Sequence, residues 1–249
     1  MKNIPFSQYS KYYDLLYQGK DYNEEAAYIL DILKIYVSPN AKLLEFGSGT
    51  GKHGAIFAKK GYNVTGIEKS KSMLENSIST DNFEIIEGDI LKISIGTDFD
   101  AVLALFHVLS YQISNESIIS AFKSAASHMT KDGIFIFDVW YTPAVHHQKP
   151  SIRIKRLEND EIKLIRIAEP TIFPNENRVD VNYLILVEQK NTQKLHTINE
   201  THPMRHFSIP EIEILLTLCG FQLEIAEEFL TKNKPSLDTW GICFVARKL

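Results

Sequence analysis

Long apolar segments are absent from this sequence of 249 residues. No run approaches the ~20 apolar residues that a membrane-spanning helix requires, and residues 1–5 lack the apolar core of a signal sequence. Cysteine is scarce as well, and Cys219 and Cys243 both lie in apolar surroundings near the C-terminus. We expect them to be buried, unpaired side chains in a reducing compartment. These absences predict a cytoplasmic protein with no membrane association.

An excess of basic residues is also missing. The chain has 27 Lys and Arg against 31 Asp and Glu, which gives a net charge of −4 and a pI near 6.1. Because a nucleic-acid backbone selects clustered cations, nucleic acid is not expected as a partner.

The histidines and acids lack the spacing of a metal site. His146 and His147 are adjacent, and on a strand they would point to opposite faces. His202 and His206 could share an ion only on a helix, whereas their segment has an extended pattern. Asp138 has no carboxylate neighbours in the sequence that would complete a magnesium site. We expect no metal.

Alternating apolar strands and amphipathic helices are what the sequence does contain. The pattern predicts helices over 24–36, 51–60, 70–77 and 115–129, the last stopped by 131–133, and strands over 42–46, 63–67, 83–87, 99–106 and 134–140. Strands that alternate with helices of this length indicate a doubly wound, mostly parallel α/β sheet. We expect residues 1–249 to form a single domain.

The periodicity changes after the fifth predicted strand. From residue 151 to about 201 it is two, which is typical of antiparallel strands with one wet face. A helix is predicted over 210–219, and strands over 221–229 and 240–247 finish the chain. We therefore expect residues 151–205 to form a small antiparallel β insertion in the domain.

A glycine-rich turn follows the first predicted strand. Gly47, Gly49 and Gly51 stand where the backbone must turn sharply and come close to a ligand, with a helix N-terminus behind them. Gly49 to Gly54 also matches the G-x-G-x-x-G spacing of dinucleotide-binding enzymes, and Glu68 lies where those enzymes place a ribose-binding acid. The glycines alone leave both cofactor classes open.

Three acids near this turn favour S-adenosylmethionine. Glu45 would repel a pyrophosphate, but its carboxylate can accept a hydrogen bond from a cationic amino acid. Glu68 can accept both ribose hydroxyls. Asp89 offers an acceptor for an exocyclic amine, and Ile90 offers an apolar wall for a purine.

These residues carry a family resemblance. Glu45-x-Gly-x-Gly-x-Gly51, Glu68, Gly88-Asp89 and Asp132-Gly133 resemble the successive motifs of class I S-adenosylmethionine-dependent methyltransferases, a Rossmann-like fold whose last strand is antiparallel. The rest of the chain is similar to the nucleotide-sugar N-methyltransferases, among them the N,N-dimethyltransferases that act on deoxyamino sugars. The segments that carry this second likeness are 9–17, 20–22, 25–26, 50–53, 105–111, 140–143 and 201–207.

The resemblance implies a site. It implies that residues 1–36 form a helical lid over the cofactor and that the insertion 151–205 forms the wall on the acceptor side. The cofactor-binding residues it implies are Tyr13, Tyr17, Tyr22, Glu45, Gly47, Ser48, Gly49, Gly51, His53, Glu68, Lys69, Met73, Asp89, Ile90, Leu105 and Tyr111. Trp140 and Arg205 are the expected acceptor-binding residues. His107 departs from the family pattern, which has a small residue there.

A nucleotide-linked acceptor would require cations. Arg153, Lys155, Arg156, Arg166, Arg178 and Arg205 are available, but residues 151–205 hold nine basic and eight acidic side chains with no evident phosphate-binding patch. The nucleotide part of the acceptor therefore follows from the resemblance alone.

The expected chemistry is methyl transfer to a small molecule, an amine by the resemblance. A neutral amine attacks without a base, whereas a hydroxyl acceptor would need one. His107, His202 and His206 are candidate bases, and Tyr111 and Tyr141 are candidate positioning groups; we take His107, His202 and Tyr141 as the catalytic set. The alternatives are a sugar or small-molecule O-methyltransferase, an NAD-dependent oxidoreductase and a cofactor-binding protein without catalysis. We expect a monomer or a homodimer.

Overall fold

The computed structural model describes residues 5–6, 8–96 and 98–249. The helices are η1 (Tyr9–Tyr12), α1 (Tyr13–Leu16), α2 (Tyr22–Tyr36), α3 (Lys52–Lys59), α4 (Lys71–Leu74), η2 (Val108–Tyr111), α5 (Asn115–His128), α6 (Thr142–Gln148), η3 (Pro174–Glu176) and α7 (Ile209–Leu218). The strands are β1 (Lys42–Phe46), β2 (Asn63–Glu68), β3 (Phe83–Glu87), β4 (Phe99–Ala104), β5 (Met129–Tyr141), β6 (Arg153–Glu158), β7 (Ile162–Phe173), β8 (Arg178–Gln189), β9 (Leu195–Phe207), β10 (Phe221–Glu228) and β11 (Gly241–Lys248).

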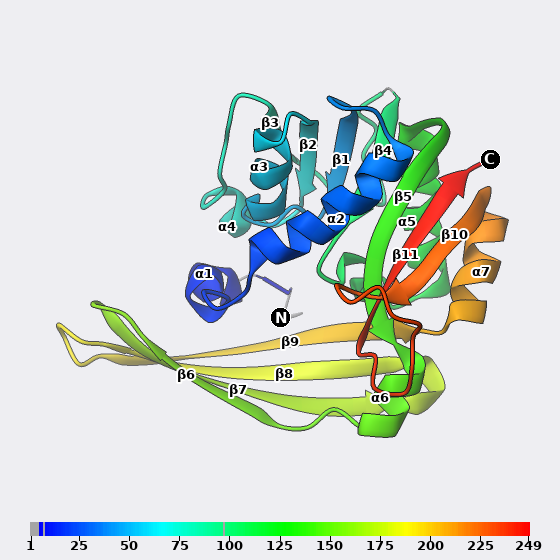
Figure 1. Ribbon diagram of the computed structural model, residues 1–249. Helices are drawn as coiled ribbons and strands as arrows, with labels where there is room; N and C mark the ends of the chain where they lie inside the picture. The colour runs from blue at the N-terminus through cyan, green and yellow to red at the C-terminus, as the bar shows by residue number, and fades with distance from the viewer. Residues whose placement is uncertain (1–4, 7, 97) are drawn as a thin grey trace.

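A parallel sheet in the order β3-β2-β1-β4-β5 forms the centre of the chain (Figure 1). Successive residues of a strand point to opposite faces, so both faces can be covered by helices. Leu43 packs in the core under α2 and α3, and Leu44 packs in the core under α5 and α7. The predicted doubly wound α/β arrangement is confirmed.

The last two strands complete this sheet in the opposite direction. β11 pairs antiparallel with β5, and β10 pairs antiparallel with β11. α7, which Ser208 caps at its N-terminus, packs against β10. The expected Rossmann-like sheet with a reversed terminal strand is therefore present.

The insertion is an antiparallel meander of β6, β7, β8 and β9, drawn below the parallel sheet in Figure 1. It does not stand apart from the main sheet. The end of β5 pairs in parallel with the end of β9, with Trp140 opposite His206 and Tyr141 opposite Phe207. The strands of the insertion thus continue the main sheet at the edge where the strands of the parallel sheet end.

The N-terminal segment packs on the insertion. Tyr9 and Leu16 are buried against Leu164, Ile185 and other apolar side chains of β7, β8 and β9. Residues 1–4 and 7 of the expected lid, residues 1–36, lie outside the described residues.

Four predicted boundaries are wrong. The helix predicted to 129 ends at His128, and Met129 already pairs with Phe99 of β4. The expected stop at 131–133 is instead an irregularity within β5, where Asp132 has φ +62° and the register shifts. β4 ends at Ala104 rather than 106, and the helix predicted over 70–77 covers only α4.

Residues 142–148 form helix α6, which was not predicted from the sequence. His146 and His147 therefore lie on a helix rather than on opposite faces of a strand. The sequence of this segment contains Pro143, which suits the first turn of a helix because its nitrogen needs no hydrogen-bond acceptor there.

Two findings concern membrane-spanning helices and the state of the cysteines. Within the described part of the chain, no helix combines the length and the apolar character that crossing a membrane requires. Both described cysteines are free thiols, Cys243 buried and Cys219 only half-buried.

The junction of the two sheets gives a first testable prediction. The Phe207 ring is fully buried in the core between α5, α7 and the sheet. We expect Phe207→Ala to lower the free energy of unfolding by about 3–5 kcal/mol, as measured by urea denaturation. The control is Ile214→Ala on the outer face of α7, where the side chain is 69% exposed and a change within about 0.5 kcal/mol is expected. A loss no larger than that of the control would contradict this account of the junction.

Candidate functional site

A cavity of about 730 Å³ lies at the carboxyl ends of β1, β2, β3 and β4. This is the edge where open parallel sheets bind their ligands, and the volume is that of a small-molecule or cofactor site. The cavity is closed by the N-terminal segment on one side and reaches Pro203 of β9 on the other.

The structure brings most of the predicted cofactor residues to this cavity. Those lining it are Tyr13, Tyr22, Glu45, Gly47, Ser48, Gly49, His53, Glu68, Lys69, Met73, Asp89, Ile90, Leu105 and Tyr111. Tyr17 and Gly51 are not among the lining residues. Tyr17 lies behind the lining, with its ring 4.6 Å from that of Tyr13 and 5.3 Å from that of Phe106.

The glycine turn joins β1 to α3. Gly47 and Gly51 have φ of +63° and +81°, a region that side-chain-bearing residues rarely adopt. A Cβ on Gly47 would come within 2.7 Å of the Val108 side chain, so the turn packs directly under the loop that follows β4. Gly51 is also the residue before the first turn of α3.

Glu68, at the end of β2, is fixed by backbone N–H groups. One carboxylate oxygen accepts from Gly49 at 2.8 Å, and the other accepts from Ser70 at 2.7 Å. Burial raises the pKa of Glu68, and these N–H groups act in the opposite direction. Each oxygen retains a further lone pair toward the cavity, so the carboxylate can accept two vicinal hydroxyls of a ribose.

Asp89 follows β3 at the far end of the cavity. Its carboxylate accepts from Lys69 Nζ at 2.8 Å and from the Leu91 backbone at 3.0 Å. Partial burial opposes ionisation, but these hydrogen bonds hold the pKa of Asp89 below its usual value. Ile90 beside it is buried. A charged acceptor next to an apolar wall suits a purine with an exocyclic amine.

Glu45, at the end of β1, is buried beneath the glycine turn. Burial raises its pKa to about 8; the nearby Glu68 carboxylate adds to this rise, while the Gly54 backbone and Lys20 oppose it. His53 Nδ1 lies 4.0 Å from the Glu45 carboxylate. Glu45 is therefore neutral at pH 7 without a ligand, and a cation placed in the cavity would favour its charged form.

A second buried carboxylate extends this cluster. Glu25 of α2 contacts His53 Nε2 at 2.9 Å and Lys20 Nζ at 2.8 Å. The Lys20 ammonium also lies 3.3 Å from the centroid of the Phe106 ring. Burial lowers the pKa of Lys20, and the surrounding acids oppose that change. We assigned no role to Lys20 or Glu25 from the sequence, although both stand in segments that carry the family resemblance.

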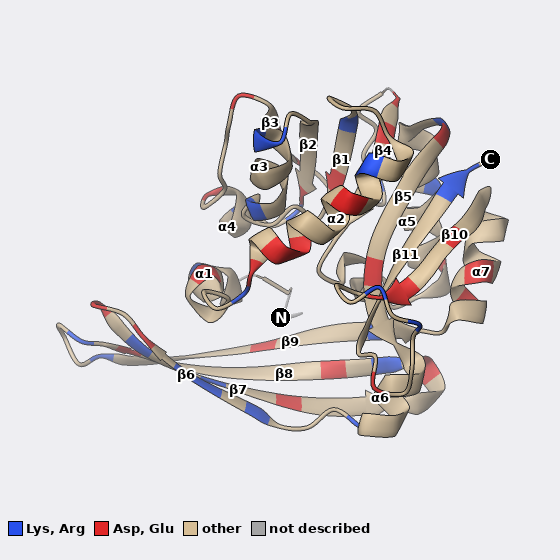
Figure 2. Cartoon of the chain, in the orientation of Figure 1, with Lys and Arg blue, Asp and Glu red and all other residues tan. Residues whose placement is uncertain are grey.

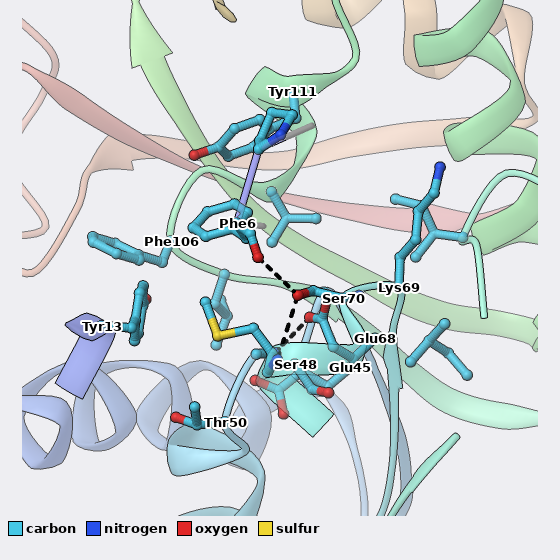
Figure 3. A pocket seen from close by; sticks show the side chains of 18 of the residues that line it. Phe6, Tyr13, Glu45, Ser48, Thr50, Glu68, Lys69, Ser70, Phe106 and Tyr111 are labelled. Carbon is cyan, nitrogen blue, oxygen red and sulfur yellow. Dashed lines mark hydrogen bonds between the residues drawn. The ribbon is translucent and has the colours of Figure 1, made fainter. Parts of the chain in front are cut away.

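Aromatic rings cover the open side of the cavity (Figure 3). The Phe6 ring is 5.4 Å from Tyr111 and 6.2 Å from Tyr13. The Ser70 hydroxyl donates to the Phe6 carbonyl at 3.1 Å, which ties this cover to the cofactor side of the cavity. Neither Phe6 nor Phe106 was predicted as a site residue: Phe6 belongs to no motif, and Phe106 was named only as part of segment 105–111.

The loop after β4 holds His107 in a left-handed conformation. Phe106 and His107 both have φ of +63°. The Asp138 carboxylate lies 2.7 Å from His107 Nδ1 and accepts from the His107 backbone N–H. Burial of Asp138 opposes its ionisation, but its contacts with His107 hold its pKa below the usual value. Non-glycine residues in this conformation cost free energy and cluster at functional sites.

None of the predicted catalytic and acceptor-binding residues, His107 included, is among the residues that line the cavity. His202 on β9 lies behind two lining side chains: its ring is 4.7 Å from that of Phe6, and its Nδ1 lies 2.9 Å from the Tyr111 hydroxyl. Trp140 packs between the rings of His107 and Trp240. Tyr141 packs against the apolar core under α5 and α7.

Arg205 was expected to bind the acceptor, and the structure places it in an intramolecular pair. Its guanidinium contacts Glu211 at 2.6 Å and Asn115 at 2.9 Å, away from the cavity. His206, also on β9, pairs with the Thr142 hydroxyl at 2.9 Å, and burial lowers its pKa to about 4.

Several other cations of the insertion also have protein partners. Lys155 donates to the Leu16 carbonyl, Arg166 donates to the Tyr9 hydroxyl, and Arg178 pairs with Glu176 and Asp180. Figure 2 shows Lys and Arg interleaved with Asp and Glu along β6–β9. Among residues 5–6, 8–96 and 98–249, no three His, Cys, Asp or Glu side chains are grouped closely enough to hold a metal ion.

S-adenosylmethionine fits the cavity on these observations. The carboxylates of Glu68 and Asp89 have acceptor capacity for a ribose and an adenine, and buried Glu45 lies where a positive ligand would stabilise it. The lysines that line the cavity each have an acidic partner, Lys52 with Asp14, Lys69 with Asp89 and Lys71 with Glu87. A pyrophosphate would face acids rather than free cations, which argues against a dinucleotide.

Comparison with known proteins agrees with this geometry. Residues 43–133 match the family model of a methyltransferase domain. A dTDP-3-amino-3,4,6-trideoxy-α-D-glucopyranose N,N-dimethyltransferase of Streptomyces venezuelae is 25% identical over 86% of this chain and 90% of its own length. A putative methyltransferase of Bacillus subtilis, YqeM, is 26% identical over 98% and 97%. The crystal structure of an S-adenosylmethionine-dependent methyltransferase from Clostridium acetobutylicum superposes with a TM-score of 0.80 at 18% identity, over 97% and 98% of the two chains, and confirms the fold.

Buried Glu45 predicts a pH dependence of stability. In the unfolded chain its pKa is the ordinary 4.5, and in the folded chain it is about 8. The folded protein then holds a proton that the unfolded chain has lost, so this group lowers stability as the pH rises from 4.5 to 8, by at most about 1.4 kcal/mol per pH unit. We expect Glu45→Gln to reduce this decline in the free energy of unfolding, measured by urea denaturation at several pH values between 4.5 and 8. Glu24→Gln, at an exposed carboxylate on α2, is the control and should follow the wild type. Identical pH profiles for Glu45→Gln and wild type would contradict the assignment.

Cofactor choice can be tested by thermal shift. At 100 times its dissociation constant a ligand adds about 2.7 kcal/mol, which raises the Tm of a chain of this size by roughly 5–10 °C. We expect this shift with S-adenosylhomocysteine and none with NAD. Glu68→Ala should remove most of it, because the ribose hydroxyls lose their acceptor. A response to NAD alone would overturn the assignment.

Proposed function

We propose that this S-adenosylmethionine-dependent methyltransferase methylates the amine of a nucleotide-linked amino sugar. One observation carries the proposal: the cavity runs without interruption from the acids that suit the cofactor to an aromatic wall between the N-terminal segment and β9. The Streptomyces relative, named for an amino-sugar substrate, aligns with 86% of this chain and 90% of its own length.

We assign the cofactor-binding roles by position. Glu68 would hold the ribose, Asp89 and Ile90 the adenine, and Gly47 and Gly49 would let the backbone approach the methionine part. When bound, the cofactor supplies a methyl group on a sulfonium, which is transferred to the acceptor by in-line displacement. The protein has to hold the acceptor in line with that methyl group, and orientation of this kind contributes about 7–11 kcal/mol.

We assign residues 1–36 the role of a lid and the insertion 151–205 that of the acceptor-side wall. The contacts of Phe6, Tyr13 and Tyr22 with the cavity support the first role, since aromatic rings exclude water from a cationic centre. The position of Pro203 at the end of the cavity supports the second.

Fewer observations support a nucleotide as part of the acceptor. Lys155, Arg166, Arg178 and Arg205 have partners within the protein. A diphosphate would have to be bound by exposed groups such as Arg153 and Arg156 of β6. The support for this part is the name of the relative.

O-methylation is a second candidate, and the His107–Asp138 pair favours it. A hydroxyl acceptor has to lose its proton during transfer, and a histidine oriented by a buried carboxylate is a common general base. The His107 side chain is 20% exposed, while its Asp138 partner is buried. Under this alternative, His107 would contact the acceptor hydroxyl.

The two candidates can be separated by product analysis. We expect the purified protein with S-adenosylmethionine to add one or two methyl groups to the nitrogen of dTDP-3-amino-3,4,6-trideoxy-α-D-glucose, as detected by mass spectrometry. The matched acceptor with a 3-hydroxyl in place of the amine should stay unmodified, and NAD should not substitute for the cofactor. Methylation of the hydroxyl compound alone would contradict the amine assignment and support the second candidate.

A further inference from the structure

A row of hydrogen bonds leads from the cavity into β9. Tyr111, at the end of η2, lines the cavity, and its hydroxyl lies 2.9 Å from Nδ1 of His202. On the other side of the imidazole, Nε2 lies 2.9 Å from a carboxylate oxygen of Glu200. His202 and Glu200 are both buried, at 2% exposure each.

The chemistry of the three groups sets the direction of these bonds. Burial opposes the ionisation of Glu200, but hydrogen bonds from His202 and from the backbone of Gln8 and Tyr9 hold its pKa below the usual value. An ionised carboxylate can only accept, so the proton of the imidazole is on Nε2. Nδ1 then accepts from the Tyr111 hydroxyl. The Tyr111 oxygen is left with lone pairs for a donor in the cavity.

The N-terminal segment closes over this row. The Phe6 ring packs 4.7 Å from that of His202 and 5.4 Å from that of Tyr111. Glu200 accepts the backbone N–H groups of Phe6, Gln8 and Tyr9, the last two at 3.1 Å each. The packed N-terminal segment therefore shields the His202 imidazole from water and fixes the Glu200 carboxylate behind it.

Among the described residues, the rings of Tyr9 and Tyr183 also face His202, at 5.2 and 5.0 Å from its ring. Burial raises the pKa of both phenols, so both stay neutral. Arg166 donates to the Tyr9 hydroxyl. Glu200 is in direct contact with the imidazole through its carboxylate.

We propose that Tyr111 takes the proton which the acceptor amine loses on methylation and passes its own proton to His202. This step rests on the proposed function. The freshly methylated nitrogen keeps its N–H bonds and takes over the positive charge of the sulfonium, so it has to lose one proton to become the neutral methylated amine. As its N–H bond breaks, an O–H bond forms on Tyr111, and the original Tyr111 proton forms an N–H bond at Nδ1. The positive charge ends on the imidazole beside Glu200. Burial raises the pKa of Tyr111, so the phenol relays the proton and is not stored as a phenolate.

A relay of this kind matters for repeated methylation, because each transfer leaves the nitrogen with a proton that blocks the next one. Tyr111 is thus a catalytic residue, while Glu200 is a positioning residue that acts through His202.

Kinetics of matched variants test the step. Tyr111→Phe removes the hydroxyl, and His202→Asn keeps an acceptor near Nδ1 that cannot take up a proton. We expect either change to lower kcat by about 100-fold, the lower end of the range for positioned proton transfer. The KM for S-adenosylmethionine and the affinity for S-adenosylhomocysteine should not change. A kcat close to that of the wild type in both variants would overturn the proposal.

The chain offers a matched control. Tyr12 of η1 and His196 of β9 form a second Tyr–His pair, with 2.8 Å between the hydroxyl and Nε2, and this pair lies in an exposed position outside the cavity. Tyr12→Phe and His196→Asn should keep the kcat of the wild type. An equal loss in these controls would show that the effect is structural and would also contradict the relay.

A spectroscopic readout separates this proposal from the proposed function. NMR of nitrogen-labelled histidine rings should show the proton of His202 on Nε2, with Nδ1 as the acceptor, and Glu200→Gln should disturb this tautomer. A proton on Nδ1 would sink the relay whether or not the protein methylates amino sugars. A wild-type protein that is inactive on every amine tested would contradict the proposed function. The tautomer of His202 would still show whether the hydrogen bonds from Tyr111 through His202 to Glu200 have the inferred direction.

Discussion

The pairing of β5 with β9 is the contact on which the rest of this structure depends. Only two residue pairs make it, Trp140 with His206 and Tyr141 with Phe207. It nevertheless brings a long antiparallel meander under the carboxyl edge of a parallel sheet. Without it, the cavity above the glycine turn would lack the wall that β9 contributes through Pro203. With it, His202 of the same strand contacts Tyr111 of η2, the helix that follows β4.

The acids Glu45 and Glu68 are the second constraint, because their charge determines which kind of ligand the cavity can bind. Burying Glu45 and Glu68 costs free energy, which the protein limits by hydrogen bonds from the backbone at Gly49, Gly54 and Ser70. An anionic ligand would add to that cost, whereas a ligand with positive charge and hydroxyl donors would reduce it. The raised pKa of Glu45 is therefore a property of the ligand-free site that a cationic ligand should reverse.

The parts of the fold that follow local pattern could be predicted from the sequence. β1 and β3 begin and end at the predicted residues, because each is a short apolar run bounded by turn residues. The glycines and the three acids were also identified, since spacing along a strand, a turn and a helix places them at one edge. These features depend on neighbours in the chain, and the sequence contains those neighbours.

The missed features depend on contacts between distant segments. The left-handed backbone of Phe106 and His107 ends β4 before the end of the apolar run, and it is supported by Asp138, thirty-one residues away from His107. Arg205 resembled an anion-binding residue until Glu211 proved to be its partner. Glu200 carries no sequence signal at all, because its partners are backbone N–H groups almost two hundred residues earlier.

The N-terminal segment is tied to both halves of the cavity through one residue. The Phe6 carbonyl accepts from Ser70, which also donates its backbone N–H to Glu68 on the cofactor side. The Phe6 N–H donates to Glu200, which orients His202 and Tyr111 on the acceptor side. A displacement of Phe6 must therefore loosen both sets of contacts together. Any ligand that stabilises one half favours the seated segment and, by linkage, organises the other half. With the roles proposed above, the contacts of Phe6 make cofactor binding and assembly of the proposed acceptor wall parts of one event.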